Sequence, residues 1–122
     1  MSRAHRVGAE RHGHRSEAIA AWWLRLKGYR IVASRYRTAA GEIDLIARRG
    51  RVLAFVEVKA RADFRAAADA VSPRQQHRIA RAAGLFLVAR PDLAQLDQRF
   101  DALLIVRRTW PRHLPDAWRT GP

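Results

Sequence analysis

Two short apolar runs on either side of a glycine constrain the fold of this chain more than any other feature. Residues 41–47 read GEIDLIA, residues 55–61 read FVEVKAR, and the break between them contains Gly50. Both runs are rich in Val, Ile, Leu and Phe, which indicates two β-strands. With Gly50 first in a two-residue loop, a type II′ turn is favoured. The sequence therefore predicts an antiparallel hairpin in the middle of the chain.

The predicted turn also sets which residues face one another across the hairpin. It places Asp44 opposite Glu57, and Glu42 opposite Lys59. Opposed residues have Cβ atoms about 4.5–5.5 Å apart, where like charges destabilise a sheet. Lys59 lies on the same face but compensates the two acids only in part, so a divalent cation with oxygen ligands is the expected addition. The alternative is a surface hairpin with solvated ion pairs.

The charge balance predicts an anionic partner. Among 122 residues, 24 are Lys or Arg and 11 are Asp or Glu, so the formal net charge is +13, and 22 of the basic residues are Arg. Binding to phosphates releases counterions, and the planar fork of arginine suits phosphate oxygens. Nucleic acid is therefore the expected partner and acidic membrane surfaces are a weaker candidate, although many Ala, Arg and Gly residues also accompany a high genomic GC content.

Several classes of function are excluded by composition and motifs. The chain has no cysteine, so it holds neither a disulfide framework nor a thiolate metal site. It shows no phosphate-binding glycine loop, no zinc spacing among its histidines, and no serine paired in sequence with His and Asp. Without a membrane-length apolar run or a signal-peptide core, we expect a cytoplasmic protein with no membrane partner.

The first third of the chain predicts an arm, a helix and a strand. Residues 1–15 read as a disordered basic arm. Ser16 is a suitable N-cap for a helix ending at Lys27, and residues 29–37 read as a strand. The expected apolar stripe of the helix consists of Ile19, Trp22, Trp23 and Leu26. The two tryptophans are interpreted as core residues, with stacking on nucleic-acid bases as the alternative.

The second half predicts another helix and two more strands. Residues 63–71 are ambiguous between loop and helix. Ser72 as N-cap and Pro73 at the first position begin a helix that ends near residue 90. Its polar first turn, with Arg74, Gln75 and Arg78, suits phosphate contact. Residues 99–106 read as a buried strand and residues 110–114 as an edge strand. Residues 115–118 read as a helical turn and residues 119–122 as a tail. The predicted domain therefore covers residues 16–118.

Three motifs carry a resemblance to a known family. Glu17, Asp44 and residues 57–59 resemble the E…D…ExK signature of the PD-(D/E)XK nuclease superfamily, and of Holliday-junction resolvases in particular. The match is closer to the YraN-like family of uncharacterised bacterial proteins, whose hallmarks GEIDLI, FVEVK with a nearby arginine, and RFD occur at residues 41–46, 55–61 and 99–101. The resemblance implies an α/β restriction-endonuclease-like fold, with a mixed central sheet flanked by helices.

The resemblance also implies roles for individual residues. Asp44, Glu57 and the Val58 carbonyl would hold Mg²⁺ or Mn²⁺, Lys59 would orient or activate the attacking water, and Glu17 would complete the site. A polar group from the following helix would come from Gln75 or Gln76, with Gln76 taken into the catalytic set. The expected nucleic-acid contacts are made by Arg61, Arg74, Gln75 and Arg78.

Metal-assisted phosphodiester hydrolysis uses such a set of carboxylates and a lysine. The first hypothesis is therefore a metal-dependent nuclease of the resolvase-like class that acts on DNA, branched or single-stranded, as a possible homodimer. The second is a nucleic-acid-binding protein that keeps the fold with little or no turnover. A basic interaction protein with ordinary ion pairs in its hairpin is the third.

Overall fold

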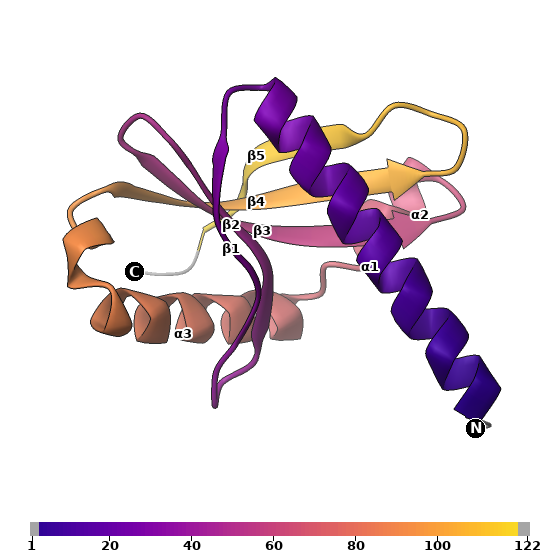
Figure 1. Ribbon diagram of the computed structural model, residues 1–122, viewed down its shortest axis with the longest axis horizontal. Helices are drawn as coiled ribbons and strands as arrows, with labels where there is room; N and C mark the ends of the chain where they lie inside the picture. The colour runs from indigo at the N-terminus through magenta and orange to yellow at the C-terminus, as the bar shows by residue number, and fades with distance from the viewer. Residues whose placement is uncertain (1–2, 120–122) are drawn as a thin grey trace.

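A computed structural model describes residues 3–119 and shows one five-stranded sheet with helices on both faces (Figure 1). The strands lie in sequence order across the sheet. Only β3 and β4 are parallel, and the other neighbours are antiparallel. The strands are β1 (Arg30–Arg37), β2 (Glu42–Arg49), β3 (Val52–Arg61), β4 (Asp97–Val106) and β5 (Arg112–Trp118). The helices are α1 (Arg3–Leu26), α2 (Phe64–Asp69), α3 (Pro73–Ala89) and the short 3₁₀ helix η1 (Pro91–Leu93).

The sheet separates two apolar clusters. On one face, Ala20 and Leu24 of α1 pack against β-strand residues such as Val56. On the other face, Phe86 and Ile79 of α3 join Phe55 and the residues around it. The predicted α/β fold with a mixed, helix-flanked sheet is therefore confirmed, and this arrangement is consistent with a restriction-endonuclease-like fold.

The predicted hairpin register is confirmed near the turn and ends before the acidic residues. Paired residues run from Arg49–Val52 to Leu45–Val56, and Gly50 has φ +60°, the sign that a type II′ turn requires of its first residue. Beyond Leu45, β2 pairs only with β1 and β3 with β4 in the described sheet. The predicted backbone pairs Asp44–Glu57 and Glu42–Lys59 are therefore wrong, because the two strands diverge there.

Helix α1 differs from its prediction in both its start and its buried face. It begins at Arg3 rather than at Ser16, and Ser16 is buried within it, so residues 3–15 continue the helix where an arm was expected, while residues 1–2 lie outside the described part. The buried side chains are Ala20, Ala21 and Leu24, whereas Trp22 is 49% exposed and Leu26 61% exposed. Small residues face the sheet because they let the helix axis approach it closely.

The C-terminal half follows the prediction up to its last strand. Helix α3 begins after Ser72, whose Oγ accepts a hydrogen bond from the Gln75 backbone N–H at 3.2 Å. The ambiguous segment 63–71 contains α2, capped by Asp63. The predicted helical turn at 115–118 is wrong, because these residues belong to β5. An edge strand tolerates Pro115, since proline there leaves no ladder hydrogen bond unmade.

None of the helices within residues 3–119 combines the length and the apolar character that a membrane crossing requires.

Candidate metal centre

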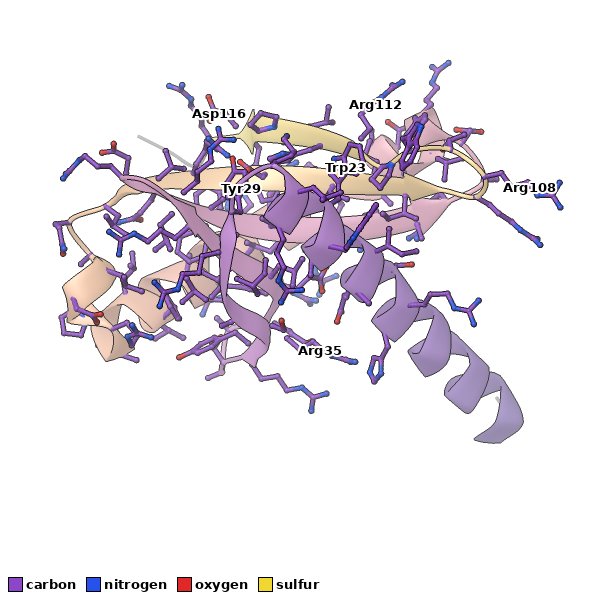
Figure 2. The ribbon with its side chains drawn as sticks, turned by 45° about the horizontal axis from the view of Figure 1, so that its top comes forward. Trp23, Tyr29, Arg35, Arg108, Arg112 and Asp116 are labelled. Carbon is purple, nitrogen blue, oxygen red and sulfur yellow. The ribbon has the colours of Figure 1, made fainter. Side chains whose placement is uncertain are left out.

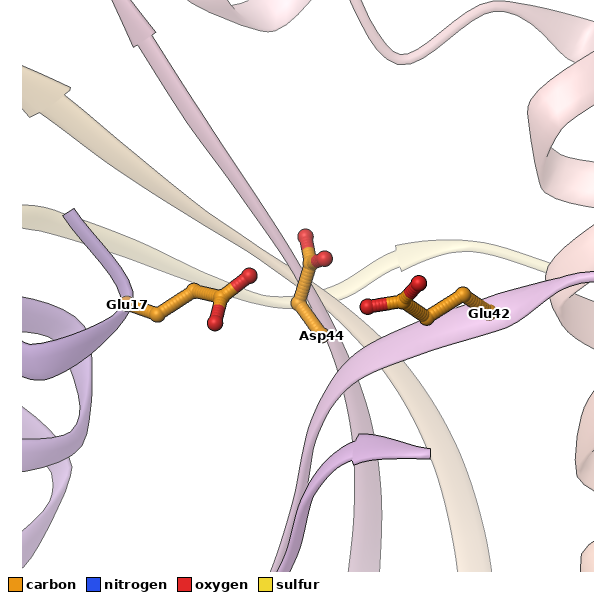
Figure 3. Close-up of side chains that lie close together, drawn as sticks. All are labelled: Glu17, Glu42 and Asp44. Carbon is orange, nitrogen blue, oxygen red and sulfur yellow. The ribbon is translucent and has the colours of Figure 1, made fainter. Parts of the chain in front are cut away.

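Three carboxylates converge where β2 and β3 separate. Glu17 comes from α1, and Glu42 and Asp44 come from β2, and each offers an oxygen within 4.8 Å of the other two. Figure 3 shows the three side chains pointing toward one another. Alternation along β2 puts Glu42 and Asp44 on the same side of the strand, and the close packing of α1 brings Glu17 to that side. Two elements far apart in sequence therefore build one acidic cluster.

Arginines partly neutralise this cluster. The Arg35 Nε atom lies 3.7 Å from Glu17 Oε2 and 3.4 Å from Glu42 Oε1, and Arg37 Nε lies 3.3 Å from Glu42 Oε2. Arg35 also has φ +52°, a left-handed conformation that is uncommon for a residue other than glycine. This strained position aims a cation between two of the three carboxylates.

A fourth carboxyl group lies against Asp44. The strand divergence leaves the Val58 N–H without its partner across the hairpin, and Asp44 Oδ2 accepts this hydrogen bond at 2.8 Å. Glu57 is only 3% exposed and shares a side-chain hydrogen bond with Asp44. Burial first, and the neighbouring Asp44 second, raise the pKa of Glu57 to about 9, although Lys59 acts in the opposite direction. Glu57 therefore carries a proton at neutral pH unless a cation replaces it.

The electrostatics of Glu17 follow the same pattern. Burial raises the pKa of Glu17, and the charge of Asp44 raises it further, while Arg35 lowers it. Two carboxyl groups around Asp44 thus hold their protons more tightly than they would in water. Additional positive charge at this point would stabilise the ionised forms of both groups.

Replacement of Glu57 by Gln should remove the part of the pH dependence of stability that Glu57 causes. Because the folded protein keeps the Glu57 proton above the ordinary pKa near 4.5, stability is highest below that pH and falls as pH rises toward about 9. Glu57→Gln removes this loss. We expect the metal-free variant to be more stable than wild type by about 1–2 kcal/mol at pH 8, with a smaller difference at pH 5. Urea unfolding at both pH values measures it.

Asp69→Asn, a change at an exposed residue of α2, is the control for this experiment and should shift neither curve. If Glu57→Gln destabilised the protein equally at pH 5 and pH 8, Glu57 would be ionised in the folded state, and its assigned protonation would be wrong.

The donor set fits a hard divalent cation. Such cations bind oxygen atoms at about 2.0–2.6 Å, so oxygens that lie within 4.8 Å of one another can reach the same ion. Glu17, Glu42 and Asp44 supply oxygen ligands only, which suits Mg²⁺ or Mn²⁺ rather than a soft metal. Glu57 would be an additional ligand once its proton is released.

The structure brings most of the predicted catalytic residues together. Glu17, Asp44 and Glu57 are neighbours, and half-buried Lys59 is close enough to Glu57 to act on its pKa. The Val58 backbone meets Asp44 through its N–H, whereas a metal contact of its carbonyl stays a prediction. Gln76 donates its side-chain amide to the Val71 carbonyl at 3.1 Å, a local contact at the start of α3, so its catalytic role also stays a prediction.

Three of the four residues predicted to contact nucleic acid are exposed. Arg61 is exposed at the end of β3, and Arg74 and Arg78 are exposed in the first turns of α3, while Gln75 is half-buried. A Cβ atom on Gly41 would lie 3.5 Å from the Arg78 Cβ atom. The β1–β2 turn therefore brings the start of α3 close to the strand that carries Glu42.

Two residues of the site were not among the predicted site residues. Glu42 is expected opposite Lys59 and as a further carboxylate of the hairpin site, without a catalytic or metal-binding role, and Arg35 is expected only as part of a strand. The signal for Glu42 was its spacing from Asp44, since residues two apart in a strand share a face. Arg35 gave no comparable signal, because the sequence does not reveal its left-handed backbone or the position of α1.

The third motif, RFD, forms a separate buried network. Asp101 is fully buried and accepts two hydrogen bonds from Arg99, at 2.8 and 2.7 Å, and one from the Asp116 backbone N–H at 3.0 Å. His113 Nε2 lies 2.7 Å from Asp101 Oδ2, and Arg99 also donates to the Tyr29 hydroxyl. These contacts join β4, β5 and the segment after α1, which positions α1 and hence Glu17.

Comparison with known proteins assigns the chain to a family. The model of "Uncharacterised protein family UPF0102" matches residues 16–105. A UPF0102 protein of Parvibaculum lavamentivorans is 60% identical over 113 residues, which cover 93% of this chain and 85% of that protein. A UPF0102 protein of Rhodopseudomonas palustris is 57% identical over 117 residues, covering 96% and 87%. With all three sequence motifs present and these relatives matching almost its whole length, the chain belongs to the uncharacterised family UPF0102, the YraN-like family that its motifs resemble.

Proposed function

We propose that this protein is a metal-dependent nuclease of the resolvase-like class that hydrolyses phosphodiester bonds in DNA. The observation that carries this proposal is the convergence of Glu17, Glu42 and Asp44 within 4.8 Å, beside buried Glu57 and next to Lys59. The net charge of +13 supports a polyanionic substrate. A symmetric homodimer would present two such centres to two strands.

Each residue of the centre has a chemical task in this reaction. Asp44, Glu57 and Glu17, with Glu42, would hold Mg²⁺ or Mn²⁺, which when bound lowers the pKa of water and stabilises charge on the leaving oxygen. Lys59 would orient the attacking water and offset the negative charge that develops on the phosphate. Arg74 and Arg78 would fix the DNA backbone at the start of α3.

One observation favours a second function, DNA binding without turnover. Arg35 already places its guanidinium within 4 Å of two carboxylates, those of Glu17 and Glu42. A cation built into the chain at this place would compete with a metal ion for the same oxygens. A protein that keeps this ion pair would retain the basic surface while lacking metal-dependent hydrolysis.

Cleavage assays on branched, single-stranded and linear DNA decide between these functions. We expect wild type to cut at least one substrate with Mg²⁺ or Mn²⁺ and none in EDTA. Lys59→Gln should reduce the rate by about 10²–10³-fold, a typical effect of removing a group that handles the attacking nucleophile's proton. Arg90→Gln, at the exposed C-terminal cap of α3, is the control for the loss of one positive charge.

The outcomes separate the two functions. DNA binding by wild type without cleavage of any substrate would support the binding function. Metal-dependent cleavage that survives Lys59→Gln unchanged would contradict the role given to Lys59.

A further inference from the structure

Three tryptophans form a cluster outside the candidate metal centre. Trp23 of α1 stacks on Trp110 of the β4–β5 connection, with ring centroids 5.7 Å apart and an interplanar angle of 29°, and Trp22 lies 6.3 Å from Trp23. Trp23 is half-buried against the α1-side core. Trp110 is 72% exposed and Trp22 is 49% exposed. We call these three residues the aromatic patch.

Exposure of this size calls for an explanation. Burial of one aromatic side chain removes about 150–250 Å² from water, and the chain leaves two large rings accessible while it buries Ala20, Ala21 and Leu24 of the same helix. Trp23 stacks on Trp110 and fixes its orientation. The exposed Trp110 ring is therefore held in one position at the surface.

Two arginines precede Trp110 in the same connection. Arg107 and Arg108 are exposed and lie within three residues of Trp110 in sequence. The guanidinium of Arg112, which is also exposed, stacks on the Phe64 ring of α2 at 4.1 Å. Arg108 has φ +66° in the tight connection between β4 and β5. Figure 2 shows Arg108 extending from that connection, with Trp23 and Arg112 on the neighbouring part of the molecule. The nearby acid Asp63 uses its carboxylate to cap the Ala66 N–H at 2.8 Å.

We propose that the aromatic patch binds unpaired bases of single-stranded DNA and thereby selects substrates with a single-stranded segment. Surfaces that bind single strands combine aromatic rings, on which bases stack, with cations that contact the backbone. Trp110 and Trp22 supply the rings, and Arg107 and Arg108 supply the cations. This specificity rests on the proposed nuclease function, because it concerns the strand that reaches the same metal centre.

The position of the patch relative to the metal centre supports this substrate. Glu17 and Trp22 belong to the same helix, and they are separated by about 8 Å along its axis and by about 140° around it. Neighbouring nucleotides in a strand are spaced by about 3.4 Å. A strand stacked on the aromatic patch would therefore pass around α1 and reach the carboxylates after several nucleotides.

Charge argues for nucleic acid over a second copy of this chain as the occupant. A patch next to Arg107 and Arg108 would meet the same two arginines in a symmetric contact, in a protein that already carries a net charge of +13. Like charges brought together in this way oppose association. A polyanion with flat bases gains from both the rings and the cations.

Binding of a fluorescein-labelled oligothymidylate in EDTA, followed by anisotropy, tests the patch without catalysis. Trp110→Ala should weaken this binding by about tenfold, the usual effect of losing one stacked base. Arg108→Ala should reduce the slope of log affinity against log salt concentration by about one, the contribution of one phosphate contact. The matched controls are Val88→Ala, which removes an exposed apolar side chain that is 80% accessible, and Arg90→Ala. Both lie at the C-terminal end of α3 and should leave the affinity unchanged.

The failure of this inference is distinguishable from failure of the nuclease function. If Trp110→Ala and wild type bound the oligothymidylate equally while wild type cleaved DNA, the patch would have no role in substrate selection. If Trp110→Ala lost binding although wild type cleaved no DNA, the patch would be supported as a strand-binding surface and only the nuclease function would fail. If Trp110→Ala instead turned a dimer into a monomer in sedimentation, with unchanged strand binding, the occupant would be a second copy.

Discussion

Asp101→Asn is expected to lower the free energy of unfolding by about 3–5 kcal/mol at pH 7, the cost of removing one partner of a buried ion pair. Asp101 is 0% exposed and accepts hydrogen bonds from Arg99 and from the Asp116 N–H, with His113 on the same carboxylate. Asparagine has nearly the same shape but no charge, so the guanidinium of Arg99 loses its counterion. Urea unfolding at neutral pH measures the loss.

The same network predicts how wild type responds to acid. Burial alone would raise the pKa of Asp101, but the hydrogen bonds from Arg99, His113 and Asp116 outweigh it and lower the pKa to about 2. A depressed carboxyl pKa stabilises the fold above the ordinary value near 3.8, and this stability is lost as pH falls from about 4 toward 2. Asp101→Asn should lack this part of the acid transition.

Asp97→Asn is the matched control, since Asp97 begins the same strand but is exposed. It should change stability by less than about 0.5 kcal/mol. A similarly small effect of Asp101→Asn would mean that water replaces the network at little cost, and the assignment of RFD to the positioning of α1 would fail.

Asp44→Asn is expected to reduce metal-dependent DNA cleavage by about a thousandfold, which corresponds to about 4 kcal/mol of lost transition-state stabilisation. Asp44 adjoins Glu17, Glu42 and Glu57. Its replacement therefore removes the one carboxylate that neighbours each of the other three. The asparagine oxygen can still accept the Val58 N–H, so the fold should persist. Steady-state rates with Mn²⁺, together with calorimetric titration of Mn²⁺, measure both consequences.

Binding to uncleaved DNA should be preserved in Asp44→Asn, because the substitution removes a negative charge that would repel phosphate in the proposed complex. Asp69→Asn in α2 is the control for the chemical change alone. Cleavage that persists in Asp44→Asn would place the reaction elsewhere in the protein. Loss of cleavage with undiminished Mn²⁺ uptake would show that Asp44 is not a ligand.

Local pattern was sufficient to predict the hairpin, its turn and helix α3. Gly50 marks the turn because the turn needs a left-handed backbone, which glycine adopts readily. Ser72 and Pro73 mark the start of α3 because the Ser72 side chain accepts a hydrogen bond from a free backbone N–H of the first turn, and Pro73 has no N–H that needs a partner. Two other predictions failed for a common reason. The stripe Ile19, Trp22, Trp23 and Leu26 has helical spacing, but the sheet accepts the flatter alanine face of α1. Likewise β5 extends to Trp118 because it pairs with β4, which local propensity does not reveal.

For the candidate site, the residue types and their order along the chain were predictable, whereas their distances were not. The sequence by itself determined that Glu17, Asp44, Glu57 and Lys59 stand in a helix and a hairpin of a basic, cysteine-free chain of a recognisable family. Only the tertiary structure decided that β2 and β3 separate beyond the Leu45–Val56 pair, on the side of Asp44 and Glu57. It also decided that α1 brings Glu17 to Asp44 and that Arg35 lies between the carboxylates. The physical reason is that secondary structure depends on neighbours in the chain, while a cluster of charges depends on how closely separate elements pack.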